Sequence, residues 1–176
     1  MPTRALDTTA IRALLDSAEG RLTGEWLLVG GALASIWFNP ARVTEDVDLI
    51  GLAGTNAERR ALMELASSVG LPVEAVNSAA DYFVQKTPGW RGELEVLRAT
   101  EHLTILRPTP TFFVVLKIGR LTEQDLDDCL LLVDFADREA LAVDRERISA
   151  AILALPPTED EPLRGRRAAL LARLAR

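Results

Sequence analysis

Three carboxylates lie within four residues of one another in the stretch Arg42-Val-Thr-Glu-Asp-Val-Asp-Leu-Ile50, at Glu45, Asp46 and Asp48. In a β-strand, residues two positions apart point to the same face, about 6.6–7 Å from each other. Asp46 and Asp48 therefore face the same way if a strand begins at or before Asp46, and Glu45 faces the other way. Neighbouring carboxylates repel unless a cation lies between them. Because Mg²⁺ prefers one or two carboxylates together with substrate phosphates, this spacing predicts a magnesium site for a phosphate-bearing substrate.

A glycine pair, Gly30-Gly31, precedes these acids by about 14 residues and follows the apolar run of residues 26–29. Glycine allows a sharp turn and a close approach of a ligand to the main chain. The start of the helix that follows presents unpaired N–H groups, which bind phosphates readily. Taken singly, the glycines fit an ordinary strand-to-helix turn and the aspartates fit solvated acids. Their succession favours a phosphate cradle followed by metal-binding carboxylates.

Other chemistries fit the sequence less well. The chain has one histidine, His102, and one cysteine, Cys129, which excludes an intramolecular disulfide, a thiolate-rich metal site and a site of several histidines. The glycine pair lacks the Gly-Lys-Ser/Thr of a phosphate-binding P-loop. Leu49 follows the second aspartate, where phosphatases with an aspartyl nucleophile have Gly-Thr. Cys129 is expected to be a buried core thiol, and Trp90 is interpreted as a core or cleft-wall residue or as a platform for a base.

The elements that position these residues follow from apolar periodicity, capping residues and Gly/Pro stops. Thr8 or Thr9 is expected to cap the first helix, Thr55 or Asn56 the third, and Thr122 forms a capping-box pattern with Asp125. Residues 73–76 are interpreted as a strand, and residues 81–85 are ambiguous. The expected helices are 7–22, 32–38, 56–69, 111–121, 123–135, 144–153 and 163–176, and the expected strands are 26–29, 47–52, 94–97 and 102–106.

The chain of 176 residues is thus predicted to be an α+β protein. Residues 1–107 form its α/β core, residues 108–155 a helical region, and residues 156–176 an acidic, proline-rich linker with an arginine-rich helix that packs on the body or contacts a partner. The net charge of −6 argues against non-specific nucleic-acid binding by the whole surface. No 18-residue apolar run and no signal-peptide pattern are seen, so we expect no membrane span and a cytoplasmic location.

Two motifs resemble those of a known family. The pattern Leu28-Val-Gly-Gly31 followed by Arg42-Val-Thr-Glu-Asp-Val-Asp-Leu49 resembles the signature of the DNA polymerase β-type nucleotidyltransferase superfamily. The stretch from Lys117 to Asp128, Lys-Ile-Gly-Arg-Leu-Thr-Glu-Gln-Asp-Leu-Asp-Asp, resembles a motif of its AbiEii-like toxin branch and relatives. The resemblance covers roughly residues 25–133. It implies the nucleotidyltransferase fold, a small mixed sheet flanked by helices, followed by a helical region.

The resemblance also implies a role for individual residues. A third carboxylate is usual in the superfamily, and Glu95 is the best match, with Glu93 as the alternative. Lys117 would reach a phosphate or pair with Asp125. The remaining roles are phosphate binding by Gly30 and Gly31, binding of two Mg²⁺ ions by Asp46 and Asp48, and support of the metal-binding strand or phosphate contact by Arg42 and Thr44.

The activity that follows from the resemblance is transfer of NMP from an NTP to a hydroxyl group of RNA, tRNA or protein, dependent on Mg²⁺. A toxin–antitoxin pair with a cognate antitoxin as partner fits the same branch. The alternative hypothesis is a nucleotidyltransferase-fold protein without turnover, acting as a binding module or as an antitoxin-like partner protein.

Overall fold

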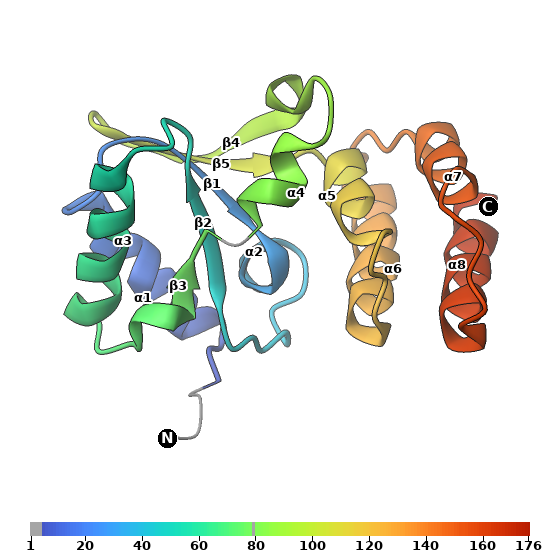
Figure 1. Ribbon diagram of the computed structural model, residues 1–176, viewed down its shortest axis with the longest axis horizontal. Helices are drawn as coiled ribbons and strands as arrows, with labels where there is room; N and C mark the ends of the chain where they lie inside the picture. The colour runs from blue at the N-terminus through green and yellow to red at the C-terminus, as the bar shows by residue number, and fades with distance from the viewer. Residues whose placement is uncertain (1–4, 79) are drawn as a thin grey trace. The chain divides into compact units, whose positions relative to one another are not determined.

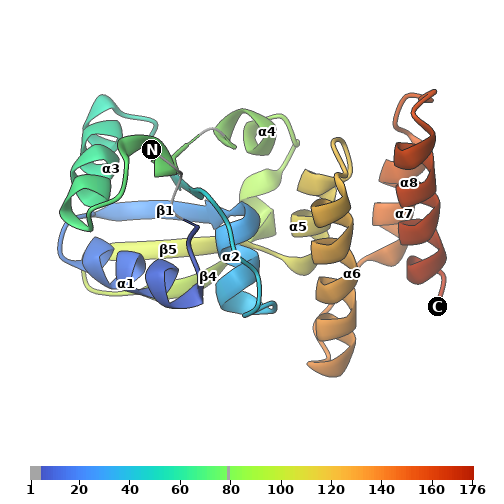
Figure 2. The same ribbon diagram turned by 90° about the horizontal axis from the view of Figure 1, so that it is seen from below.

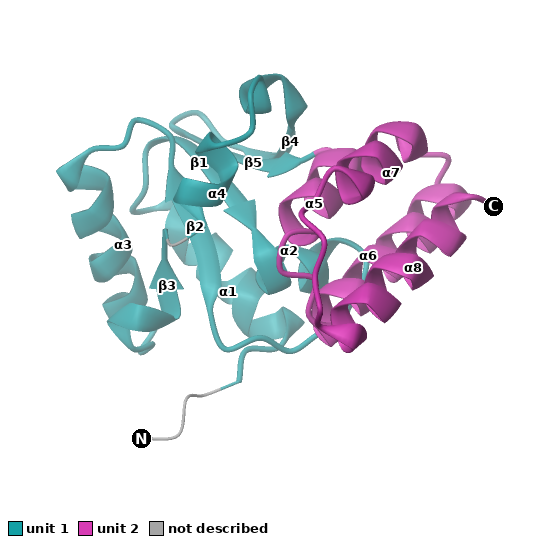
Figure 3. Ribbon diagram, turned by 45° about the vertical axis from the view of Figure 1, so that its right-hand side comes forward, with its two compact units in different colours: residues 1–108 teal, residues 109–176 magenta. Residues whose placement is uncertain are grey.

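The computed structural model describes residues 5–78 and 80–176. The chain divides into two compact units, Met1–Pro108 and Thr109–Arg176, called unit 1 and unit 2 (Figure 3). Unit 1 contains the sheet and unit 2 consists of helices, so the predicted α+β class with a C-terminal helical region is confirmed. No helix within the described residues is both long enough and apolar enough to span a membrane.

The sheet of unit 1 has five strands in the order β3-β2-β1-β5-β4 (Figure 1). It is mixed, because β1 pairs antiparallel with β2 and parallel with β5, β2 pairs parallel with β3, and β4 pairs antiparallel with β5. The central strand β1 is the apolar run that precedes the glycine pair, and burial on both faces explains its lack of alternation. The bounds are β1 Gly24–Val29, β2 Val47–Gly51, β3 Val76–Asn77, β4 Leu94–Ala99 and β5 Leu103–Pro108.

Four α-helices and two short 3₁₀ helices complete the described part of unit 1, and the bounds are α1 Thr8–Glu19, α2 Gly30–Trp37, α3 Asn56–Ser68, η1 Val73–Ala75, α4 Asp81–Gln85 and η2 Trp90–Glu93. Arg98 of β4 forms ion pairs with Asp16 and Glu19 of α1. Arg107 of β5 lies over the ring of Trp37 in α2, with 3.9 Å between the guanidinium carbon and the ring centroid. Figures 1 and 2 place α4 on the other side of the sheet from α1.

Those contacts identify the two faces of the sheet. Paired residues of neighbouring strands share a face, and consecutive residues alternate. Arg98 pairs with Ile105, and Ile105 with Trp26, so the face of these residues is covered by α1 and α2. We call it the first face. The second face carries the row Val96, Leu106, Leu27 and Ile50, which are paired residues of neighbouring strands from β4 to β2.

Several local predictions need correction. Asp7, not Thr8 or Thr9, caps α1, because its Oδ1 accepts the N–H of Ala10 at 2.8 Å. Strand β2 begins at Val47 as predicted, one residue after Asp46, so the condition under which Asp46 and Asp48 face the same way is not met. Residues 73–75 form a 3₁₀ turn after Pro72, so the predicted strand of residues 73–76 is confirmed only from Val76 onward. The predicted capping of α3 by Thr55 is confirmed, with Glu58 completing a capping box.

Unit 2 contains α5 Pro110–Lys117, α6 Glu123–Arg138, α7 Arg145–Leu153 and α8 Glu161–Leu174. Helix α6 begins with the predicted capping box of Thr122 and Asp125. Helix α5 ends at Lys117 rather than at Leu121, and Leu121 has the left-handed φ of 36°, which ends helical geometry before α6.

The arginine-rich helix α8 packs on α6 and α7 of its own unit. It buries Leu170 and Leu174, while Arg173 forms ion pairs with Asp134 and Asp137 of α6 at 2.7 and 2.6 Å. Arg166 donates to the carbonyl of Leu121 at 2.6 Å. Of the two roles predicted for this helix, the structure shows packing on the acidic body.

Candidate functional site

The glycine pair lies directly against the aspartate strand. Val29, the last residue of β1, pairs with Asp48 of β2, so Gly30 follows at the same end of the sheet. Gly30 has a φ of +72°, which an L side chain adopts only with strain. A Cβ at this position would lie 2.6 Å from Oδ2 of Asp48. The carboxylate of Asp48 therefore packs on the bare main chain of Gly30 at the beginning of α2.

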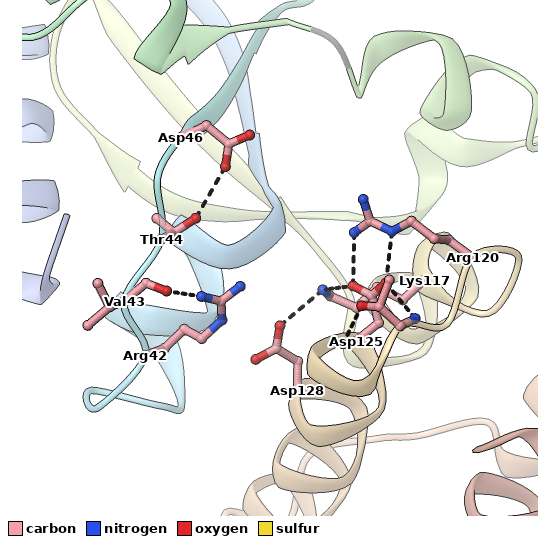
Figure 4. A network of polar contacts seen from close by, with 9 residues as sticks. Arg42, Val43, Thr44, Asp46, Lys117, Arg120, Asp125 and Asp128 are labelled. Atoms are coloured by element: carbon pink, nitrogen blue, oxygen red, sulfur yellow. Dashed lines mark hydrogen bonds and ion pairs between the residues drawn. The ribbon is translucent and has the colours of Figure 1, made fainter. Parts of the chain in front are cut away.

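Gly31 makes the corresponding approach to the segment that precedes the strand. A Cβ at Gly31 would lie 2.7 Å from Nη2 of Arg42 and 2.9 Å from Oγ1 of Thr44. The Thr44 hydroxyl donates a hydrogen bond to Oδ1 of Asp46 at 3.2 Å, and the Arg42 guanidinium donates to the carbonyl of Val43 (Figure 4). The second glycine thus leaves room for a basic and a hydroxyl side chain, and Thr44 in turn orients Asp46.

The N-terminal segment holds this loop in place. Leu6 and Thr44 form an isolated antiparallel bridge, in which the Leu6 N–H donates to Thr44 O at 2.7 Å and the Thr44 N–H to Leu6 O at 3.0 Å. The Thr8 hydroxyl donates to the carbonyl of Pro40 at 2.9 Å and lies 2.7 Å from the hydroxyl of Ser35. The bridge between Leu6 and Thr44 could not be predicted from the sequence, because the pairing of single residues produces no periodic pattern.

Six of the predicted site residues therefore meet at one end of the sheet, and we call them the glycine–carboxylate site: Gly30, Gly31, Arg42, Thr44, Asp46 and Asp48. Its carboxylates differ in environment, because Asp46 is exposed just before β2 and Asp48 is half-buried within it. The start of α2 adds main-chain N–H groups that suit an anion. The site thus combines hard oxygen donors with a helix start whose two glycines allow the side chains of Asp48, Arg42 and Thr44 to pack closely against it.

The donor set has two carboxylates rather than three. Across the described ranges, 5–78 and 80–176, no three or more His, Cys, Asp or Glu residues form a group able to hold a metal ion. Mg²⁺ in proteins is often held by one or two carboxylates together with waters and substrate phosphates. Asp46 and Asp48 fit that number of carboxylates, and the start of α2 beside Asp48 suits a phosphate group.

The structure does not bring Glu95 to this site. Glu95 precedes Val96, which lies on the second face, so the side chain of Glu95 points to the first face. Asp48 is two residues from Ile50 and shares the second face. Three strand spacings, about 14 Å, separate β4 from β2 in the sheet order. Glu93, the alternative, is the last residue of η2, which directly precedes β4 at the edge of the sheet.

Glu95 instead forms an ion pair with Arg107, its partner in the strand register, at 2.6 Å. Burial lowers the pKa of the Arg107 guanidinium, and the charge and hydrogen bond of Glu95 oppose that shift. Arg107 also lies over Trp37, so Glu95 is part of a structural contact between the sheet and α2.

Lys117 lies in unit 2 and forms a buried ion cluster there (Figure 4). Its ammonium donates to Asp125 at 2.8 Å and to Asp128 at 3.0 Å. Lys117, Asp125 and Asp128 are 8 %, 2 % and 1 % exposed. Of the two roles predicted for Lys117, the structure shows the pairing with Asp125. Asp128 is the additional partner, eleven residues beyond Lys117 and one helical turn from Asp125.

Asp125, at the start of α6, makes five hydrogen bonds with three residues. Its carboxylate accepts one from Lys117, two from Arg120 and one from the N–H of Thr122, and its own N–H donates to the Thr122 hydroxyl. Burial raises the pKa of this carboxyl, but the Arg120 hydrogen bonds, the Lys117 charge and the main-chain N–H of Thr122 together hold it well below its usual range. Asp125 is therefore ionised at every physiological pH, and Lys117 balances its charge.

Three other residues considered from the sequence lie outside the glycine–carboxylate site. Cys129 is buried in α6, and burial raises the pKa of its thiol to about 12, as expected for a core thiol. His102 is exposed, with Nε2 3.8 Å from the Glu101 carboxylate. Trp90 begins η2, and the guanidinium of Arg91 lies 4.7 Å from the centroid of its ring.

Comparisons of the chain with protein-family models, with curated proteins and with solved structures give no significant match.

Proposed function

We propose that unit 1 has the nucleotidyltransferase fold, binds an NTP together with Mg²⁺ at the glycine–carboxylate site, and transfers the nucleotidyl group to a hydroxyl of an acceptor. The observation that carries this proposal is the packing of Asp48 on Gly30. It places the start of α2, where main-chain N–H groups suit a phosphate, within contact distance of a carboxylate that can ligate a metal, although 17 intervening residues separate them in the sequence.

Each residue of the site has a distinct task in this proposal. The main chain of Gly30 and Gly31 at the start of α2 receives the phosphates of the NTP. Asp46 and Asp48 would hold Mg²⁺, which when bound acidifies the attacking hydroxyl and neutralises charge on the leaving phosphates. Thr44 keeps Oδ1 of Asp46 oriented through its hydrogen bond.

The Arg42 guanidinium lies beside Gly31, where its charge favours the binding of an anionic triphosphate. In the reaction, the acceptor oxygen forms a bond to the α-phosphorus while the bond from that phosphorus to the bridging oxygen breaks. Pyrophosphate leaves, and the hydroxyl proton passes to water. The exposed position of Asp46 leaves the site open to an acceptor.

A second candidate function is nucleotide binding without turnover, as a binding module or as one member of a toxin–antitoxin pair. The placement of Glu95 favours it, because the carboxylate expected to complete the metal site is paired with Arg107 on the first face. Under this alternative, Asp46 and Asp48 bind Mg²⁺ and the nucleotide, and no transfer follows.

Two measurements test the proposal and separate the candidates. Isothermal titration with Mg²⁺ and ATP, or each of the other common NTPs, should show binding to the wild type and none to the Asp46→Asn/Asp48→Asn double variant. Glu64→Gln, an exposed carboxylate of α3, is the matched control and should bind like the wild type. Equal binding by the wild type and the double variant would refute the site.

The second measurement is transfer of label from an α-labelled NTP to RNA or protein in a cell lysate. The proposed transferase labels an acceptor, and the Asp46→Asn/Asp48→Asn variant does not. Nucleotide binding with no incorporation from any NTP would establish the binding module in its place.

A further inference from the structure

The segment that crosses from β3 to β4 presents aromatic rings and basic side chains to solvent. Tyr82 and Phe83 of α4 are 61 % and 62 % exposed, and their rings meet edge to face with centroids 5.5 Å apart. The Lys86 ammonium lies 3.9 Å from the centroid of Tyr82. Farther along, Arg91 lies over Trp90. We call these five residues, Tyr82, Phe83, Lys86, Trp90 and Arg91, the stacking surface.

The stacking surface is connected to the rest of unit 1 at two points, Val84 and Arg91. Val84 of α4 is 1 % exposed, which fixes the helix and turns its two neighbouring aromatic rings outward. Gln85 donates to both carboxylate oxygens of Asp81 across the helix at 2.8 and 2.9 Å. Arg91 donates to the carbonyl of Leu52, just beyond β2, at 3.1 Å. Val84 and Arg91 thus fix the segment that carries the rings, while the rings of Tyr82 and Phe83 themselves extend into solvent.

The glycine–carboxylate site lies nearby. Asn77 of β3 pairs with Asp48, and α4 begins four residues later, so chain length alone keeps its start within about 14 Å of Asn77. Helix α4 is on the side of the sheet opposite α1, which is the side that Asp48 faces (Figure 2). An acceptor on the stacking surface would lie on the same face as the Asp48 carboxylate.

The chemistry of the surface suits unpaired bases. Every base has a π-face that stacks on an aromatic ring, and basic side chains beside the ring contact the adjoining phosphates. The exposed parts of Tyr82 and Phe83 together amount to on the order of 250 Å². A standard protein–protein interface takes about 800 Å² from each partner, so these rings fit a few bases better than a folded partner.

We propose that the stacking surface binds single-stranded RNA and thereby presents the acceptor strand to the glycine–carboxylate site. The presentation of an acceptor rests on the proposed transferase activity, but the binding of RNA is measured without any NTP. Because Lys86 and Arg91 contact at most two phosphates, the logarithm of the affinity should fall with the logarithm of salt concentration with a slope of only about −1.4.

Fluorescence anisotropy of a labelled oligouridylate tests the surface on the full chain. Wild type should bind the single strand and bind a duplex of the same length far more weakly. Tyr82→Leu and Phe83→Leu keep the apolar character and remove the ring, so each should weaken binding by about 5-fold to about 150-fold. Met63→Ala removes an exposed apolar side chain of α3 and is the matched control, with unchanged affinity.

The outcomes separate this inference from the proposed function. No binding of the oligonucleotide, equal binding of the duplex, or wild-type affinity in Phe83→Leu would overturn the stacking surface, and the first result would leave a protein partner as its occupant. Titration of Phe83→Leu with Mg²⁺ and ATP should match the wild type; a parallel loss would assign the ring to the donor base. If the wild type binds RNA but no NTP, the proposed transferase activity is refuted, while the stacking surface as an RNA-binding site is supported.

Discussion

Substitution of Gly30 by alanine separates the two reasons for a glycine at this position. The left-handed φ of +72° costs an L residue about 1–2 kcal/mol, and the smaller entropy of the unfolded chain returns about 0.4–1 kcal/mol. A net loss of about 1 kcal/mol in the free energy of unfolding follows from the backbone alone. In addition, the new Cβ would lie 2.6 Å from Oδ2 of Asp48, so the carboxylate has to move.

Gly54 is the matched control, because its φ is +68° and a Cβ there would meet nothing within 4 Å. Gly54→Ala should therefore show a similar stability loss by urea unfolding and should retain Mg²⁺-dependent NTP binding. Gly30→Ala should lose at least tenfold in NTP affinity, since displacement of one metal-ligating carboxylate costs more than about 1.4 kcal/mol. If both variants bind NTP with equal affinity in isothermal titration, the contact between Gly30 and Asp48 has no functional role.

Three further predictions concern unit 2. Lys117→Met removes the buried cation that pairs with both Asp125 and Asp128 and should cost about 3–5 kcal/mol in urea unfolding, whereas Lys86→Met, at the other, exposed lysine of the chain, should change little; equal stability of the two variants would contradict the role of the cluster. Because the pKa of Asp125 is lowered in the folded state and an unfolded aspartate titrates near 3.9, the stabilisation is present above about pH 4 and is lost as the pH falls below it; urea midpoints measured against pH should decline there, and more steeply in the wild type than in Asp125→Asn. With its pKa raised to about 12 by burial, Cys129 should resist a thiol reagent at pH 8 and react once urea unfolds the chain, and rapid labelling of the native protein would show that the thiol is accessible.

The sequence was sufficient to predict features that depend on short-range patterns. The capping boxes at Thr55 and Thr122 follow from residues three positions apart, and the structure has both. The glycine pair directly follows β1, and the two aspartates lie at the start of β2, its antiparallel neighbour, so their meeting at one end of the sheet follows from chain connectivity.

Features that depend on strand order could not be predicted from the sequence. Glu95 lies in an apolar, strand-like stretch, but only the order β3-β2-β1-β5-β4 and the register with Arg107 show that it is remote from β2 and faces the other way. The bridge of Leu6 with Thr44 joins single residues and has no pattern to detect. The partners of Arg173 likewise depend on how α8 lies against α6.

The most direct test of the central claim is isothermal titration with Mg²⁺ and ATP, or each of the other common NTPs, of the wild type, the Asp46→Asn/Asp48→Asn variant and the Glu95→Gln variant. The glycine–carboxylate site predicts Mg²⁺-dependent binding to the wild type, loss of binding in the double aspartate variant, and retained binding in Glu95→Gln, because Glu95 pairs with Arg107 away from the site. Absence of binding to the wild type, or binding that survives without both aspartates, would contradict the claim that this site holds a nucleotide.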